Sequence, residues 1–141
     1  MPLKIQLKPK ERVIINGAVI EGHSDNRTEI VVMNNASVMR QKHILQEGQA
    51  DTPCKRLYFT LQMMYIDEDE REKYKPSYQR FFKDLHDTMT LPTIKTSLDL
   101  IDRSVESGKY YDALKVCREL IKVEAELLKI ANPLGEETAD E

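Results

Sequence analysis

The residues of this chain best suited to chemistry are cations beside aromatic rings, or cations repeated along one face of a strand. Lys4 and Lys8 share one face of an extended segment, since alternate residues of a strand point the same way. Arg40-Gln41-Lys42-His43 adds further phosphate contacts, and Lys55-Arg56-Leu57-Tyr58-Phe59 joins a basic pair to two aromatic rings. Proteins that bind single-stranded RNA combine such cationic tracks with flat side chains on which bases stack. The pattern predicts a nucleic-acid interface, although basic strands are common on small sheets and both rings also suit a hydrophobic core.

The predicted interface consists of eight cations, which would contact phosphates and bases, and one ring that would serve as a stacking platform. These residues are Lys4, Lys8, Lys10, Arg12, Arg40, Lys42, Lys55, Arg56 and Tyr58. Residues 1–60 carry nine Lys and Arg against six Asp and Glu, a charge of +3, whereas residues 61–141 carry twelve against eighteen, a charge of −6. This division favours two surfaces with different partners, although ordinary scatter of surface charge explains the counts equally well.

Motifs for catalysis or cofactor binding are missing from the sequence. It contains no glycine-rich phosphate loop, paired C-x-x-C, H-E-x-x-H or G-x-S-x-G. His23, His43 and His86 lie in separate segments, and Cys117 lies on an apolar stripe, where a cysteine acts as a small hydrophobe. Cys54 is expected at the surface or in the first turn of a helix. The sequence therefore predicts a protein that is not an enzyme and holds no metal or cofactor.

One acidic run, Asp67-Glu68-Asp69-Glu70, resembles a metal site in composition alone. It lacks the glycine and the alternating ligands of a calcium-binding loop. Acidic side chains favour the positive end of a helix dipole. The run is therefore expected to be the solvated entrance of a helix.

Length and composition predict a globular chain of one domain, or of two small lobes that share a core. The chain has 141 residues, of which 40% are hydrophobic and 32% are charged. Its apolar runs are far shorter than the ~20 residues of a membrane-spanning helix. Lysines interrupt the first ten residues, where a secretory signal needs an unbroken apolar stretch. With two cysteines and no disulfide framework, the expected location is the cytoplasm.

Short strands are predicted in the first part of the chain, at residues 3–8, 12–15, 18–21, 28–33 and 36–40. Asn16-Gly17 separates two β-branched runs, which is the signature of a hairpin with a type I′ turn. Strands of this number and length predict a small antiparallel sheet or a partly closed barrel.

Helices are predicted from residue 53 onward. The segment 53–66 fits both a strand and a helix, and Thr52-Pro53 favours the helix, because Thr is a good N-cap and Pro suits the first helical position. Pro76 is expected to open the next helix, whose apolar stripe runs over 78–89. A third helix is predicted from Pro92 to Gly108, and a fourth over 109–131 with Leu128 among its inward residues.

The predicted fold class is α+β, with three divisions along the chain. Residues 1–50 would form a β-rich, RNA-binding lobe, and residues 51–131 a lobe of three to four helices that also binds partners. Residues 132–141 would form an acidic, flexible tail.

Several blocks of the sequence closely resemble the FlbT family of flagellum biosynthesis repressors of alphaproteobacteria. The matching blocks are Met1-Pro2-Leu3-Lys4, Asn16-Gly17-Ala18-Val19, Asn35-Ala36-Ser37-Val38-Met39-Arg40, Thr52-Pro53, Lys55-Arg56-Leu57-Tyr58-Phe59, Met63-Met64-Tyr65-Ile66-Asp67 and Tyr110-Tyr111-Asp112-Ala113-Leu114. The resemblance implies action after transcription. Family members associate with the 5′ untranslated region of flagellin mRNA, limit its translation and promote its decay. A small partner, FlaF, opposes this action, and in some relatives the effect resembles activation.

The sequence and the resemblance together predict a post-transcriptional regulator that binds the flagellin mRNA leader and is not itself a nuclease. The β-rich lobe also resembles, loosely, the carbon-storage regulator fold, which suggests the first strand and Arg40–His43 as the RNA-binding edge. The alternative is an adaptor that binds FlaF or flagellin through the stripes at 78–89 and 91–105, with RNA association indirect. Burial of these stripes against each other in a helical hairpin is the preferred interpretation. A homodimer is compatible with the sheet edges.

Overall fold

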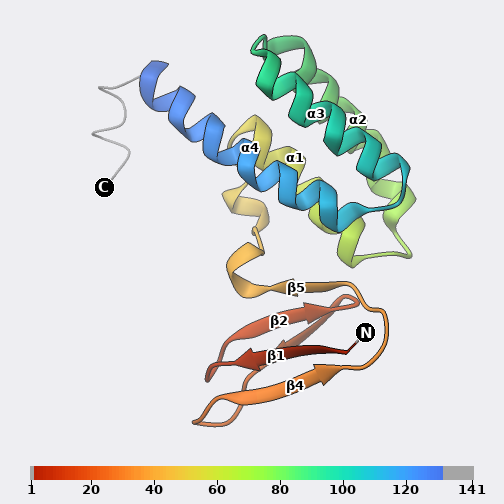
Figure 1. Ribbon diagram of the computed structural model, residues 1–141, viewed down its shortest axis with the longest axis vertical. Helices are drawn as coiled ribbons and strands as arrows, with labels where there is room; N and C mark the ends of the chain where they lie inside the picture. The colour runs from red at the N-terminus through yellow and green to blue at the C-terminus, as the bar shows by residue number, and fades with distance from the viewer. Residues whose placement is uncertain (1, 132–141) are drawn as a thin grey trace.

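The computed structural model describes residues 2–131 and has a β lobe followed by a helical lobe (Figure 1). The strands are β1 (Leu3–Leu7), β2 (Arg12–Ile15), β3 (Ala18–Glu21), β4 (Thr28–Val32) and β5 (Val38–Arg40). Two 3-10 turns, Gln41–His43 and Glu47–Gln49, lead to α1 (Pro53–Ile66), α2 (Arg71–Thr88), α3 (Pro92–Glu106) and α4 (Tyr110–Ala131). The predicted α+β class is confirmed. The acidic tail predicted for 132–141 lies outside the described residues.

The strands form two small antiparallel sheets, in the orders β1-β4 and β3-β2-β5. The β2–β3 hairpin turns at Asn16 and Gly17, whose φ angles of 50° and 83° both lie in the left-handed region. A type I′ turn requires positive φ at both positions. The predicted hairpin is therefore confirmed, and the sheets stay open rather than closing into a barrel.

The pleat of β2 divides the β lobe between two hydrophobic cores. Val13 packs with Ile5 and Leu7 in a small core between the two sheets. The next residue, Ile14, points to the other face, where it and its partner Met39 on β5 join the core of the helices. Figure 1 shows β5 between the rest of the β lobe and the helices. The two lobes therefore share hydrophobic packing rather than only a linker.

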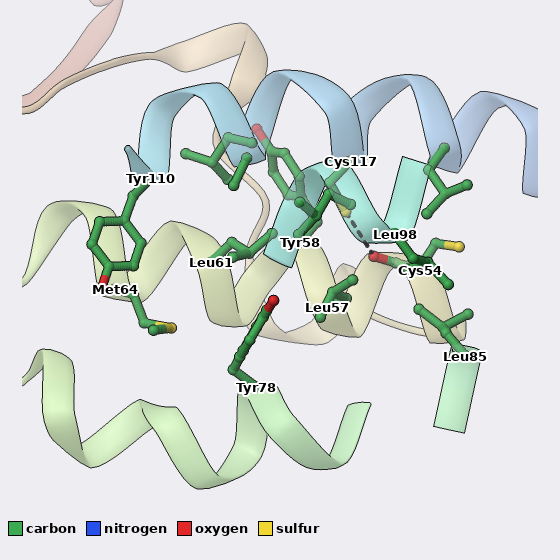
Figure 2. Close-up of a cluster of buried hydrophobic side chains, with 14 of the residues drawn as sticks. Cys54, Leu57, Tyr58, Leu61, Met64, Tyr78, Leu85, Leu98, Tyr110 and Cys117 are labelled. Carbon is green, nitrogen blue, oxygen red and sulfur yellow. Dashed lines mark hydrogen bonds between the residues drawn. The ribbon is translucent and has the colours of Figure 1, made fainter. Parts of the chain in front are cut away.

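Helix α1 is the centre of the large core. Its N-cap is Thr52, whose side chain accepts a hydrogen bond from the Lys55 amide at 3.3 Å, and Pro53 occupies the first turn. Leu57, Leu61 and Met64 lie on one face and are fully buried. Figure 2 shows these side chains packed among residues of the other helices. The prediction of a helix over 53–66 is confirmed, because the cap and the 3–4 residue spacing agree.

Helix α2 begins at Arg71, so the prediction that Pro76 opens this helix is wrong. Pro76 lies inside the helix, and the acidic run before Arg71 forms the entrance. Asp67 accepts a hydrogen bond from the Glu70 amide at 3.3 Å, and Arg71 Nε donates to the Met64 carbonyl at 2.8 Å. With these contacts the helix starts at Arg71, more than one turn before the proline.

The apolar stripes of α2 and α3 do not form a hairpin in which each buries the other. Helix α2 packs chiefly on α1, α3 packs on α4, and α1 and α4 pack together. The side chains Tyr78, Leu85, Leu98 and Ile101 all enter this common core. The preferred prediction, in which α2 and α3 bury each other, therefore names the wrong partner for α3. Helix α4 is longer and supplies a larger apolar face than α2 does, so α3 packs on α4.

Helix α4 starts after Gly108, whose φ of 75° ends α3 as predicted. Cys117 and Leu120 are buried on its inner face. The sequence predicts an inward-pointing Leu128, but this residue is 51% exposed, because the end of α4 extends beyond its neighbours (Figure 1).

Candidate nucleic-acid interface

The cations predicted near the start of the chain lie on β1, β2 and the turn between them. Lys4 is exposed on β1, and Lys8 and Lys10 lie in the turn. Arg12 Nε donates to Glu21 Oε1 at 2.9 Å, so part of its charge is balanced by an exposed ion pair. Lys10 and Arg12 line one groove of 480 Å³ with Gln41.

Arg40 does not share a face of the sheet with Arg12. Arg40 pairs with Val13 across the β2–β5 ladder, whereas Arg12 lies on the opposite face beside Ile14. Lys42 is exposed in the 3-10 turn that follows β5. The first predicted cations are thus divided between two surfaces of the β lobe.

Lys55 and Arg56 lie in the first turns of α1. Lys55 Nζ is 3.5 Å from Asp51 Oδ1. Arg56 lines a 310 Å³ groove between α1 and α2, beside Phe59 and Phe81. The other predicted cations do not line this groove, so the nine residues do not form one continuous track.

The stacking role predicted for Tyr58 does not fit its position. Tyr58 is 2% exposed, and its ring lies inside the helical core (Figure 2). Its hydroxyl donates to the His43 carbonyl at 2.7 Å and accepts from Arg118 Nη1 at 3.2 Å. Burial raises the pKa of this phenol. Tyr58 therefore ties α1 to the β5 exit and to α4 instead of offering a face to a base.

A different group of side chains meets in a 280 Å³ pocket where β5, α1 and α4 come together. Its polar and aromatic lining comes from Arg40, His43, Tyr65, Tyr111 and Arg118. None of the described residues that line it is acidic. Two guanidinium groups and two phenol rings around one hollow are suited to phosphates and flat rings.

The aromatic side of this pocket is held in place by the protein backbone. The Tyr65 hydroxyl accepts from the Val38 amide at 2.9 Å and donates to the Val38 carbonyl at 3.1 Å. The ring centroids of Tyr65 and Tyr111 lie 5.6 Å apart with a 44° tilt. The Arg118 guanidinium carbon lies 5.9 Å from the Tyr111 centroid, and Lys115 Nζ lies 5.5 Å from it.

Burial and the nearby cations together lower the pKa of His43, which lines the same pocket. Burial lowers the pKa of this imidazole, and Arg118, Lys42 and Arg40 lower it further. At neutral pH His43 is therefore uncharged, and the positive charge of the pocket resides on the two guanidinium groups.

The family comparison assigns the chain. The family model described as "Flagellar protein FlbT" matches residues 3–128. The chain belongs to the FlbT family. The resemblance expected from the sequence blocks is thereby confirmed.

Relatives in this family carry names that describe a regulator. The chain is 40% identical to the flagellum biosynthesis repressor protein FlbT of Caulobacter vibrioides, over 91% of this chain and 90% of that protein. It is 39% identical to a probable flagellum biosynthesis repressor of Rhodopseudomonas palustris, over 91% and 98% of the two chains. A Brucella anthropi relative of the same description is 32% identical, over 94% and 86%. No solved structure matches. These names support a regulatory role in flagellar synthesis.

Sequence reasoning missed three of the five polar and aromatic residues that line the FlbT pocket: Tyr65, Tyr111 and Arg118. One signal was available, since Tyr111, Lys115 and Arg118 recur at helical spacing and so share a face of α4. The placement of that face beside Arg40 depends on how the two lobes pack, which no local pattern records.

The remaining candidates for chemistry lie in ordinary structural positions. Cys54 is in the first turn of α1, as one of the two predicted positions has it, and burial raises its pKa. Burial likewise raises the pKa of Cys117. Over residues 2–131 no group of His, Cys, Asp and Glu is placed to hold a metal ion, and no helix is both long and apolar enough to cross a bilayer.

Proposed function

We propose that this FlbT family member regulates flagellum biogenesis after transcription, by binding the 5′ untranslated region of flagellin mRNA. The observation that carries the proposal is the pocket between β5, α1 and α4, which Arg40, Arg118, Tyr65 and Tyr111 line together and to which the described part of the chain contributes no acidic lining residue. Guanidinium groups bind phosphates, and phenol rings stack on bases. The other exposed cations of the β lobe would extend phosphate contacts away from the pocket.

Repression follows from occupancy of the leader and needs no chemistry by the protein. A protein bound over the leader excludes ribosomes, and a message without ribosomes is open to cellular nucleases. By this mechanism the protein would limit translation of the message and promote its decay without cutting RNA. Incubation of the purified protein with leader RNA, with and without Mg²⁺, should leave the RNA intact. Cleavage that copurifies with the protein would contradict this part.

A salt series with fluorescently labelled leader RNA tests direct binding. Each phosphate contact to a single strand steepens the dependence of log affinity on log salt by about 0.7. The double variant Arg40→Glu and Lys42→Glu should weaken binding and flatten this slope. A matched control is Lys83→Glu with Lys122→Glu, which changes the net charge equally on exposed faces of α2 and α4.

The result that contradicts leader recognition is equal binding of a scrambled RNA at every salt concentration. Equal loss in both double variants would show an effect of net charge rather than of this surface.

One observation favours the alternative, an adaptor that binds FlaF or flagellin. Val123, Leu128 and Ile130 are exposed apolar residues on the second half of α4, and Ile130 is 77% exposed. Apolar contacts persist in high salt, unlike phosphate contacts. Capture of purified FlaF or flagellin that survives high salt and is lost in Leu128→Glu would support the adaptor. Leader binding that fails at low salt in the same preparation would exclude the RNA proposal.

A further inference from the structure

We propose that the pocket between β5, α1 and α4 takes one unpaired nucleotide of the bound RNA, its base against Tyr111 and its phosphate between Arg40 and Arg118. This inference rests on the proposed function and names the part of the RNA that the site recognises. It assigns specificity for single strands to a hollow built by both lobes.

The size of the pocket favours one nucleotide over a folded stem. Its volume is 280 Å³, close to the lower limit of about 300 Å³ for pockets that bury small ligands. Double-stranded RNA is recognised by contacts across its wide minor groove, over many base pairs. A hollow of this size instead suits a base that has left the stack.

Tyr111 offers a stacking surface that is already in position. Tyr111 is 40% exposed. The ring of Tyr65 on α1 packs against the Tyr111 ring, with 5.6 Å between the two ring centroids. Tyr65 is in turn fixed by two hydrogen bonds to Val38 of β5. Little side-chain freedom is lost when a base binds, which favours affinity.

Arg118 is oriented by a contact that leaves most of its donors free. One of its five N–H groups can donate to the buried Tyr58 hydroxyl, through Nη1 at 3.2 Å. The remaining N–H groups are available to an anion, and Arg40 approaches the same pocket from β5. His43 also lines the pocket. Its imidazole is uncharged at neutral pH, so it adds no third positive charge beside the two guanidinium groups. Two guanidinium groups that line one pocket match the charge of a phosphate.

Affinity measurements with labelled leader RNA test the pocket through Tyr111. Tyr111→Ala should weaken binding about 5- to 150-fold, the range for loss of one base stack. Tyr111→Phe keeps the ring and should stay within about two-fold of the parent protein. Arg40→Gln should weaken binding and flatten the dependence of affinity on salt. Lys122→Gln removes the same charge from an exposed position of α4 and should change neither.

Crosslinking of the unaltered protein supplies a measurement that does not depend on any variant. Leader RNA that contains 4-thiouridine, irradiated in the complex, should crosslink to peptides that carry Tyr65 or Tyr111. Leader binding that survives Tyr111→Ala, with crosslinks only outside the pocket, would overturn this inference and leave the proposed function standing. Failure of the unaltered protein to bind the leader at low salt would overturn both.

Discussion

Glu124 is a buried carboxylate on α4 whose hydrogen-bond partners, Thr52 and Cys54, lie at the start of α1, far away in the sequence. It is 4% exposed on α4, and its Oε1 accepts from the Thr52 hydroxyl at 2.6 Å. Its Oε2 accepts from the Cys54 amide at 3.0 Å. The amides at the start of a helix lack partners within the helix and carry positive partial charge. A side chain from α4 thus completes the N-terminal cap of α1.

Removal of this carboxylate should destabilise the protein. Glu124→Ala removes the acceptor of a half-buried hydroxyl and of a buried amide, at a cost of roughly 2–3 kcal/mol in the free energy of unfolding. Glu124→Gln keeps one acceptor and should cost less. Urea unfolding measures the difference, with Glu119→Ala as the control, because Glu119 is exposed on the same helix and forms an exposed ion pair with Lys122. A Glu124→Ala protein as stable as the control would show that the cap contributes nothing.

His43 makes stability depend on pH in a definite direction. Its pKa in the folded protein is lowered from the ordinary 6.5, by burial first and then by Arg118, Lys42 and Arg40. The unfolded chain therefore binds the proton more readily, so stability falls as pH drops below about 6.5 toward the lowered pKa. His43→Gln should lose less stability than the parent over this window. Thermal unfolding from pH 7.5 to 5 tests this, and parallel curves for the two proteins would contradict it.

At the scale of elements, the β2–β3 hairpin sets the edge of the lobe that faces α1. Gly17 has φ +83°, and a Cβ added there would lie 3.3 Å from the Ile66 carbonyl oxygen. Asn16 accepts from the Ser37 amide at 2.8 Å through Oδ1, and its own amide donates to the Ser37 carbonyl at 2.8 Å. The turn therefore lies close against the end of α1 and is hydrogen-bonded to the segment before β5.

Gly17→Ala should cost about 1–2 kcal/mol of stability, because an alanine resists the left-handed conformation. Gly48→Ala is the matched control, since an added Cβ there meets nothing within 4 Å. That change should be neutral or slightly stabilising, because it restricts the unfolded chain. Denaturant midpoints of the two variants give the comparison, and equal midpoints would contradict the role of the turn.

Local signals predicted the elements well, and they failed where a competing contact decided the outcome. Asn16-Gly17 and Thr52-Pro53 act within a few residues, so the sequence reveals the hairpin and the start of α1. Pro76 misled because the Asp67 and Arg71 contacts begin α2 earlier. The prediction for Tyr58 failed because Lys55 and Arg56 are close to it in sequence but are not buried with it. The face of α1 that carries Tyr58 is buried in the core.

At the scale of the molecule, α1 docks the β lobe through one row of polar side chains. Tyr58, Gln62 and Tyr65 recur at helical spacing and bond to the backbone of residues 38–45. Gln62 accepts from the Leu45 amide at 2.8 Å and donates to the Leu45 carbonyl at 2.8 Å. The candidate pocket lies along this junction, so its geometry depends on both lobes. Sequence patterns describe each lobe separately and for that reason do not reveal it.

The shared core leads to a prediction about how the whole chain unfolds. Met39 of β5 is 1% exposed and packs with the helices, as does Ile14 of β2. Neither small sheet can bury these side chains without α1, so both lobes should unfold in one cooperative transition. Far-ultraviolet circular dichroism, which follows the helices, and hydrogen exchange of strand amides should report the same free energy of unfolding.

Met39→Ala should lower both readouts together by roughly 2–5 kcal/mol, the usual cost of truncating a buried methionine. Val19→Ala is the control, because Val19 is exposed on β3. If strand amides exchange freely in Met39→Ala while the helices keep their stability, the lobes are independent. In that case Arg40 and Arg118 would not be held at a fixed separation, and leader binding would rely on the β lobe alone. Coincident loss instead means that any mutation in the shared core also disturbs the pocket, so variants that test RNA contacts must be chosen from exposed residues such as Arg40 and Tyr111.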